Sequence, residues 1–289
     1  MKFRKNHTLF IGITSFNDEQ WIGVCISALR RTLQGESYKI IVLDNRSSDT
    51  TPILAQQHGA EVISHACEQG EALNILLHQS RAEHTLLIHS DVILLHHGWY
   101  DLLKQKLKES IVLVSPNDIG LGNYLRTYGD GKPESSFMFF ATRPIKALGK
   151  MKRAYLKKFL KNPGLYPFRH FDFYGPHVTH RIPEVLQNKS KGWHAMNVLP
   201  SRRLPEAWFQ YENPKANWDA EWGYYNYGFG NFYSLNGVIT HYHNWYSRQL
   251  KNGATELNPN GVPLAYIRGY SQRFLNDYQN DRVNLPDVK

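Results

Sequence analysis

Four short polar clusters in the first half of the sequence carry residue types that can bind a ligand or a metal ion. Three of them directly follow apolar runs, and one lies in a predicted loop. If the apolar runs are parallel strands, their carboxyl ends meet at one edge of a sheet, which is where such sheets bind ligands. We therefore expect the clusters to converge. They are Thr14-Ser15-Phe16-Asn17, Asp44-Asn45-Arg46-Ser47-Ser48-Asp49, Gln69-Gly70-Glu71-Ala72-Leu73-Asn74 and His89-Ser90-Asp91.

Asp91 is the first candidate for a metal ligand, because it follows the apolar run 85–89. A Mg²⁺ or Mn²⁺ ion that bridges two phosphates takes hard oxygen ligands, usually from one or two carboxylates. The alternative is that Asp91 only caps the turn that follows the strand.

The other clusters suit the binding of a polar ligand. Asp44 can accept hydrogen bonds from a base N–H group or a ribose hydroxyl, or it caps a turn with Ser47. Gly70 allows a ligand to approach the backbone closely, or it is an ordinary loop glycine. Asn74, one helical turn later, can steady the loop.

The elements that must position these clusters alternate between β-type and α-type patterns from Thr8 to Pro116. Such alternation predicts an α/β fold with a mostly parallel, doubly wound sheet. Either Asn17 or Asp18 is the expected N-cap of the first helix. The predicted strands span 9–16, 39–44, 61–64, 85–89 and 111–115, and the predicted helices span 21–33, a short stretch after Pro52, and 71–80.

The second half of the chain is less regular and richer in aromatic residues, above all from Trp208 to Tyr233. We expect it to pack on the first half as a smaller subdomain. The basic segment from Lys150 to Lys161 is either a solvated helix or an interfacial helix that meets anionic lipid.

Composition limits the classes of partner. Lysine and arginine total 34 against 25 acidic residues, a formal charge of +9 that favours anionic ligands or surfaces. No nucleic-acid motif accompanies this charge, so no nucleic-acid partner is expected. Cys25 and Cys67 are too few for a disulfide framework. Without a visible secretory signal or membrane span, we expect a cytoplasmic protein, with peripheral contact at the inner face of the membrane as an option.

The order and spacing of the four clusters resemble the family 2 glycosyltransferases and their relatives with a GT-A fold. The resemblance extends from about Leu9 to Pro116. It implies a nucleoside diphosphate sugar as donor, most readily a UDP-sugar, and a divalent cation, Mn²⁺ or Mg²⁺. By this match residues 1–118 form the nucleotide-sugar-binding half and 119–289 the acceptor-facing half of one GT-A domain. By the same match Thr14, Asn17 and Asp44 line the nucleoside pocket, and Asp49 and Asn74 have a more structural role. The further donor-binding candidates are Gly70, Asn74 and Ser90, the last within the D-x-D position.

The D-x-D position of the family departs from its pattern here. His89 replaces the first aspartate, and Asp91 alone is retained. A site that includes imidazole suits Mn²⁺ better than Mg²⁺. Metal-free operation, with basic residues on the diphosphate, is the alternative.

Two histidines near the end of the chain can compensate. His241 and His243 are two residues apart on a predicted strand and so face the same way. Some GT-A relatives supply a metal-ligating histidine from this side, and we take His241 as the preferred candidate. The alternative is that one histidine forms a structural hydrogen bond and the other is exposed. Activity would then fall as the pH drops through about 6.5, the pKa of an ordinary histidine. Arg248 can pair with the diphosphate in a bidentate manner, or it is a surface residue.

An inverting transferase needs a general base for the acceptor hydroxyl. Asp219 and Glu221 are the first candidates, with Asp172 behind them; the alternative for each is a capping or surface carboxylate. The surrounding tryptophans and tyrosines suit a sugar platform or core packing. Glu134 and Ser135 lie in a segment that resembles the part of the family beyond the donor site, where they contact the donor or acceptor or merely form a loop.

The resemblance therefore implies a hexosyltransferase, inverting rather than retaining, that acts on a glycan or lipid-linked acceptor in polysaccharide or glycoconjugate synthesis. A sugar-nucleotide nucleotidyltransferase would need an arginine- and glycine-rich loop after the first strand, where this chain has Thr14 to Asn17. A carbohydrate-binding protein that uses the aromatic half would leave the four polar clusters unexplained.

Overall fold

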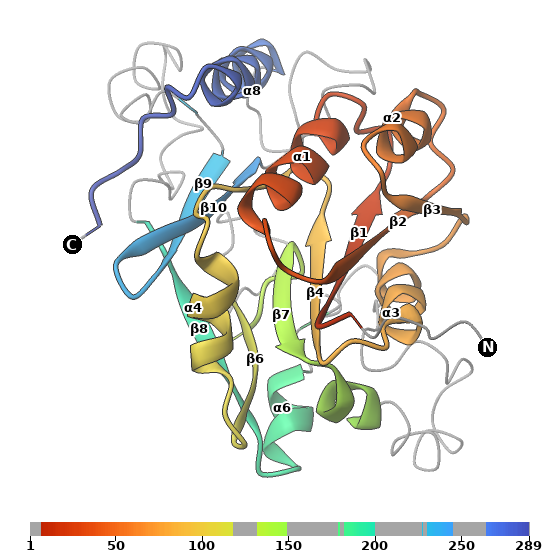
Figure 1. The fold of residues 1–289 in the computed structure, drawn as a ribbon, viewed down its shortest axis with the longest axis vertical. Helices are drawn as coiled ribbons and strands as arrows, with labels where there is room; N and C mark the ends of the chain where they lie inside the picture. Colours follow the sequence, from red (N-terminus) through yellow and green to blue (C-terminus); the bar gives the residue numbers. More distant parts are fainter. Residues whose placement is uncertain are drawn as a thin grey trace, which may run out of the picture.

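One sheet runs through the molecule and joins both halves of the chain. The computed structural model describes residues 7–117, 132–148, 179, 182–199, 227, 230–244 and 264–288. Within these residues, ten strands form a sheet in the order β3-β2-β1-β4-β7-β6-β8-β9-β10-β5. Figure 1 shows this sheet between the helices. Strands from either side of residue 118 belong to it.

The N-terminal part of the sheet is parallel, as the sequence predicts. β1 (Leu9–Ser15) lies between β2 (Tyr38–Asp44) and β4 (His84–His89), and β3 (Glu61–Ser64) pairs with β2. The register places Ser15 opposite Asp44 and Thr14 opposite His89. The carboxyl ends of β2 and β4 therefore lie at the same edge, and the expectation that Asp44 and Asp91 share that edge is confirmed.

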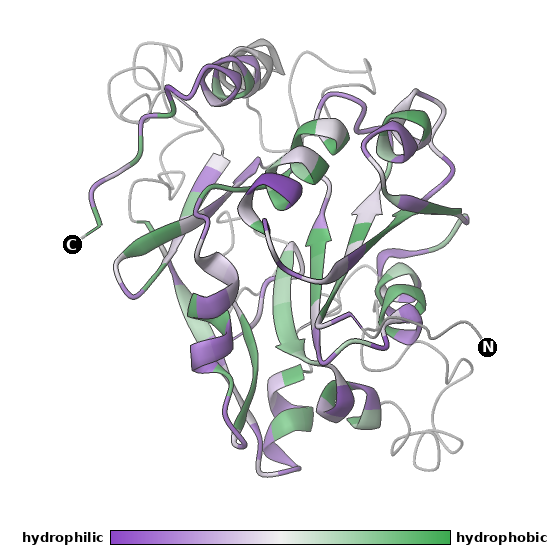
Figure 2. Cartoon of the chain, viewed as in Figure 1, coloured by the Kyte–Doolittle hydropathy of each residue, from purple (hydrophilic) through white to green (hydrophobic). Residues whose placement is uncertain are grey.

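Helices cover both faces of this parallel part, which confirms the doubly wound arrangement. On β1, Leu9, Ile11 and Ile13 pack in the core cluster that contains α1 (Ile22–Thr32). Phe10 packs in a second cluster, with the apolar residues of α3 (Gln69–Gln79). A short helix, α2 (Thr51–Gln57), carries Pro52 in its first turn as expected. In Figure 2 the central strands β4 and β7 are mainly in the hydrophobic colour.

The rest of the sheet is mixed. An antiparallel strand, β7, lies between β4 and β6, and β8 runs parallel to β6. β9 and β10 pair antiparallel, and β10 also pairs antiparallel with the three-residue strand β5. The remaining elements are β5 (Val92–Leu94), α4 (Trp99–Lys106), β6 (Ile111–Pro116), β7 (Phe137–Ala141), α6 (Ile182–Gln187), β8 (Gly192–Val198), β9 (Gly230–Leu235), β10 (Val238–Asn244) and α8 (Leu264–Gln279).

An aromatic cluster joins α8 to the start of α1. The rings of Tyr242 and Phe274 stack with centroids 3.7 Å apart, and Trp21 stacks on Phe274 at 6.1 Å. Tyr227 meets Phe274 edge to face at 5.3 Å. Some of the aromatic side chains of the second half therefore serve core packing. In the described residues, no helix is both long and apolar enough to span a bilayer.

Two local predictions are wrong. α3 begins at Gln69, so Gly70 lies in the helix rather than in a loop, while Asn74 lies in it as the predicted helix 71–80 requires; the Asn74 amide donates to the Gly70 carbonyl at 2.7 Å. The N-cap of α1 is Trp21, with no side-chain cap. An additional turn precedes this helix, because the Asp18 carbonyl accepts hydrogen bonds from the backbone N–H groups of residues 21 and 22.

We predict that Gly12→Ala destabilises the fold, because Gly12 lies where β1 and α3 approach closely. A Cβ atom there would lie 2.7 Å from Leu87 Cδ2 and 3.0 Å from Leu76 Cβ. Such overpacking costs about 1–3 kcal/mol. The control is Gly269→Ala in α8, where a Cβ would meet nothing within 4 Å. That change should raise stability by up to about 1 kcal/mol through helix propensity. Urea unfolding measures both, and equal midpoints for the two variants would contradict the packing described.

Candidate functional site

Strand β10 is held against the end of the fourth polar cluster. The backbone N–H of Asn244 donates to the Asp91 carbonyl at 3.0 Å, and that of Leu95 donates to the Thr240 carbonyl at 2.9 Å. In this antiparallel register His243 lies opposite Val92. Residues from the far end of the chain therefore reach the carboxyl edge of the parallel strands.

His243 bridges two buried carboxylates. Its Nε2 lies 3.4 Å from Asp91 Oδ1, and its Nδ1 lies 3.1 Å from Glu134 Oε1. The three side chains are only 9–10% exposed. Burial alone lowers the pKa of His243, but Asp91 and Glu134 outweigh it and raise this pKa from 6.5 to about 9. Without a metal ion, the imidazole is therefore protonated at neutral pH.

The same edge gathers a set of metal-ligating atoms. His89, Asp91 and His243 each offer one such atom, and the three atoms lie within 4.8 Å of one another. The two imidazole rings are 5.8 Å apart and nearly perpendicular. Two nitrogens and one carboxylate oxygen form a donor set that suits Mn²⁺ and the later divalent metals better than Mg²⁺.

His241, the preferred sequence candidate, lies elsewhere. Its ring is sandwiched between Phe137 at 4.1 Å and Tyr233 at 4.6 Å, and its Nδ1 lies 3.0 Å from Thr240 Oγ1. Burial first, and then the charge of His243, lowers the pKa of His241 well below 6.5. The structure thus brings His243 to Asp91 and leaves His241 in an aromatic stack, because the register places His241 opposite Leu94.

Glu134 is held firmly in its place beside His243. Its Oε2 accepts a hydrogen bond from Tyr233 Oη at 2.9 Å, and its Oε1 accepts one from Ser136 Oγ. Its backbone carbonyl accepts from Ser115 Oγ at 3.1 Å. The sequence singled out Glu134 for contact with donor or acceptor, but its link to His243 depends on a long-range pairing that no local pattern reveals.

Gln69 connects α3 to this cluster. Its Nε2 lies 2.7 Å from His89 Nε2 and 3.1 Å from Ser135 Oγ. Asp18 contributes from the other side, since its carboxylate accepts a hydrogen bond from Ser90 Oγ. From the sequence, Asp18 is expected only as a helix cap, although its position directly after the first polar cluster is a signal for the site.

The Asp44 and Asn17 clusters are tied to each other. Asp44 is buried and accepts hydrogen bonds from both the backbone N–H, at 3.0 Å, and the hydroxyl of Ser47. The turn-capping interpretation of Asp44 thus holds in this structure. Asn17 has a positive φ of 53°, and its side-chain oxygen accepts a hydrogen bond from Ser48 N at 2.8 Å. Asp49 caps the start of α2 through Thr51 N at 2.9 Å, a structural role as expected.

A small hollow of about 40 Å³ opens where β1 and β2 end and α3 begins. This volume is well below the roughly 300–1,000 Å³ typical of small-molecule sites. Thr14 Oγ1 is buried in this region without a hydrogen-bond partner among the described residues. The hollow is lined by Thr14, Ser15, Phe16, Leu43, Asn45, Cys67, Gln69 and Ala72.

Several candidates lie outside the described residues. They are Asp172, Asp219, Glu221, Arg248 and the basic segment 150–161.

Comparisons with known proteins bear on the family. No curated protein matches the chain. A solved structure of glucosyl-3-phosphoglycerate synthase from Mycobacterium tuberculosis with Mn²⁺, UDP and glucosyl-3-phosphoglycerate is 22% identical, with a TM-score of 0.39 over 48% of this chain and 58% of that one. The same enzyme with Mn²⁺, UDP and phosphoglyceric acid is 21% identical, with a TM-score of 0.40 over 55% of this chain and 66% of that one. The present chain thus spans 58% of the length of the first structure.

The model described as glycosyl transferase family 2 matches residues 10–171, which is more than half of the chain. This span contains the four polar clusters and the parallel strands that carry them. The chain therefore belongs to glycosyl transferase family 2.

Proposed function

We propose that this glycosyltransferase takes a sugar from a nucleoside diphosphate sugar, most readily a UDP-sugar, while Asp91 and His243 hold a divalent cation on the diphosphate. The observation that carries the proposal is the placement of His243 between Asp91 and Glu134. A metal-ligating histidine typically presents one ring nitrogen to the metal and donates the other N–H to a carboxylate. Nε2 of His243 faces Asp91, and Nδ1 faces Glu134.

The donor set fits a divalent ion, with Mn²⁺ favoured over Mg²⁺ because of the imidazoles. Such an ion neutralises the charge that develops on the diphosphate leaving group. Asp91 and His243 are the ligands from the chain, with His89 as the third. Glu134 is the residue that orients His243, and Gln69 orients His89.

The hollow at the ends of β1 and β2 is the proposed place of the nucleoside. Thr14 offers a buried hydroxyl there. Asn17 and Asp44 are chain neighbours of the lining residues Phe16 and Asn45, and their bonds to Ser48 and Ser47 hold this backbone in place. Gly70 and Asn74 shape the first turns of α3, and Ser90 is held by Asp18. Arg248 is proposed as a partner of the diphosphate.

For the acceptor side, we propose an inverting transfer in which Asp219 or Glu221 takes the proton of the acceptor hydroxyl. The formal charge of +9 supports an acceptor that is anionic or lies at an anionic surface, such as a lipid-linked or surface glycan. Synthesis of such a glycan at the inner face of the cytoplasmic membrane fits this chemistry.

We predict that His243→Ala abolishes the Mn²⁺ enhancement of UDP binding, as does Asp91→Asn. Glu134→Gln should weaken Mn²⁺ binding by about 10–100-fold, the usual cost of losing a partner that orients a ligand. Isothermal titration with UDP and Mn²⁺ measures all three. His97→Ala, an exposed histidine, is the control and should bind as the wild type does. Unchanged Mn²⁺ dependence in His243→Ala would contradict the site.

We also predict a distinctive pH dependence of stability in the metal-free protein. The pKa of His243 in the folded state, about 9, lies above its unfolded value of 6.5. Protonation therefore stabilises the folded form, and this contribution is complete below pH 6.5 and is lost as the pH rises to about 9. The loss over this window is on the order of 3 kcal/mol.

The measurement compares urea unfolding of the wild type and His243→Gln across this window, in the presence of a chelator. The glutamine variant cannot bind the proton, so its stability should change less with pH. If the free energy of unfolding of the two proteins changed with pH in parallel, the two carboxylates would not hold a proton on His243. Because the pKa is raised, the acid limit near pH 6.5 expected for an ordinary histidine does not apply to the metal-free site.

A further inference from the structure

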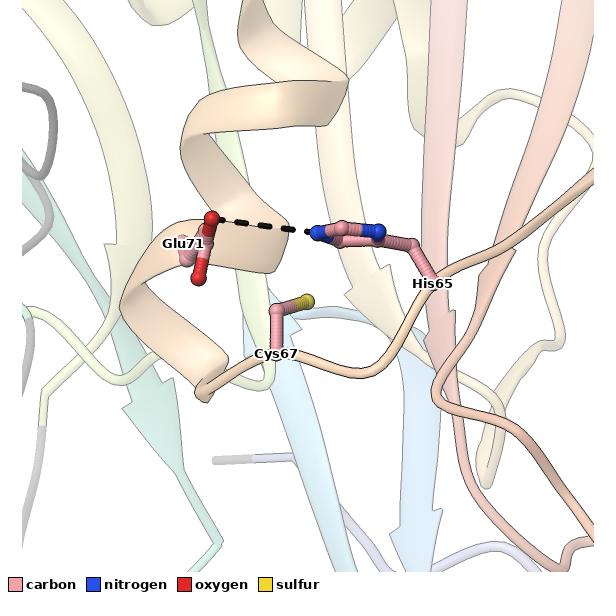
Figure 3. Close-up of side chains that lie close together, drawn as sticks. All are labelled: His65, Cys67 and Glu71. Atoms are coloured by element: carbon pink, nitrogen blue, oxygen red, sulfur yellow. Dashed lines mark ion pairs between the residues drawn. The ribbon is translucent and has the colours of Figure 1, made fainter.

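A second group of metal-ligating side chains lies apart from Asp91, between the end of β3 and the first turn of α3. Its members are His65, Cys67 and Glu71 (Figure 3). One ligand atom from each lies within 4.8 Å of the others, and His65 Nε2 is 3.8 Å from Glu71 Oε1. Figure 3 shows the imidazole directed toward the carboxylate, with the thiol close to both.

The backbone that carries these side chains is fixed. The N–H of His65 donates to the Asp44 carbonyl at 2.9 Å, and that of Cys67 donates to Asn45 Oδ1 at 2.8 Å. Glu71 lies in the first turn of α3. Because three anchored points present the three ligands, binding an ion requires only side-chain adjustment.

The distances fit such an adjustment. Zinc–nitrogen and zinc–sulfur bonds of about 2.0–2.3 Å in a tetrahedron place neighbouring ligand atoms roughly 3.3–3.8 Å apart. The pair His65 and Glu71 is already at 3.8 Å. Their side chains are 49% and 45% exposed and so can rotate to close the remaining gap to the thiol.

The ligand types identify the class of ion. A thiolate, an imidazole and a carboxylate select Zn²⁺ and its close analogue Co²⁺, whereas Mg²⁺ prefers oxygen ligands. Burial first, and then the charge of Glu71, raises the pKa of Cys67 to about 11. That disfavours the alternative role of a reactive thiolate, which needs a lowered pKa. On metal binding, the thiol proton passes to solvent as the sulfur–metal bond forms.

We propose that His65, Cys67 and Glu71 bind a zinc-class divalent ion at a site separate from Asp91 and His243. This inference is independent of the proposed function. Cys67 also lines the hollow at the ends of β1 and β2, so the ion would lie at the wall of that hollow. Water would complete the coordination, as in zinc sites with three protein ligands.

Cobalt spectroscopy tests the proposal on the wild-type chain, without nucleotide. Co²⁺ bound to a thiolate gives a charge-transfer band in the near ultraviolet, and the Asp91 group contains no thiol. Titration of the reduced, metal-free protein with Co²⁺ should produce this band, and Zn²⁺ should displace it. The band should be absent in Cys67→Ser. His65→Ala and Glu71→Gln should each weaken Co²⁺ binding at least about tenfold.

Cys25→Ala is the matched control, because it removes the other cysteine, which is buried in the core. It should keep the band and the affinity, and circular dichroism checks that each variant is folded. A wild-type protein without the band, or a Cys67→Ser variant that keeps it, would overturn the proposal. A normal band in a chain that fails to bind UDP would instead count against the proposed function alone.

Discussion

The antiparallel pairing of β10 with β5 is the constraint on which the site depends. β5 has only three residues, but it lies directly after His89-Ser90-Asp91. Pairing with it brings His243 to Asp91 from more than half the chain away. The ladder also places β10 over β7, where Phe137 stacks on His241. A parallel sheet alone would supply the carboxyl edge and one carboxylate, but it would lack the imidazole from the C-terminal half.

The electrostatic consequence is a buried site with more negative than positive charge. Two carboxylates, from Asp91 and Glu134, share one imidazole. Buried charges are costly unless paired, and removing one partner of a buried pair typically costs about 3–5 kcal/mol. In the metal-free protein, a proton on His243 neutralises part of the buried negative charge of Asp91 and Glu134. A divalent ion, with two positive charges, neutralises more of it. The same arrangement therefore explains the raised pKa of His243 and the affinity for a cation that we propose, since the proton and the metal compete for one place.

The parallel half of the fold could be predicted because each of its strands and helices is recognisable from a short stretch of sequence. Apolar runs such as 39–44, followed by cap and turn residues, reveal strand, helix and edge without knowledge of distant segments. Asp91 was found in this way. The sequence pattern does not tell which of His241 and His243 lies beside Asp91, because residues two apart on a strand share a face. Only the register of β10 with β5 distinguishes them. The sequence names Glu134 and Asp18 but not their partners in the site, because those partners, His243 and Ser90, are distant in sequence.

The central claim is that a divalent ion binds between Asp91 and His243 when the nucleotide is present. Anomalous scattering from crystals grown with Mn²⁺ and UDP tests it most directly, because the peak at the manganese edge locates the ion independently of any assumed ligand. The account predicts one peak at coordination distance from the Asp91 carboxylate and from Nε2 of His243, with Nδ1 still held by Glu134. Clear UDP density with the manganese peak elsewhere, or with no peak, would contradict it.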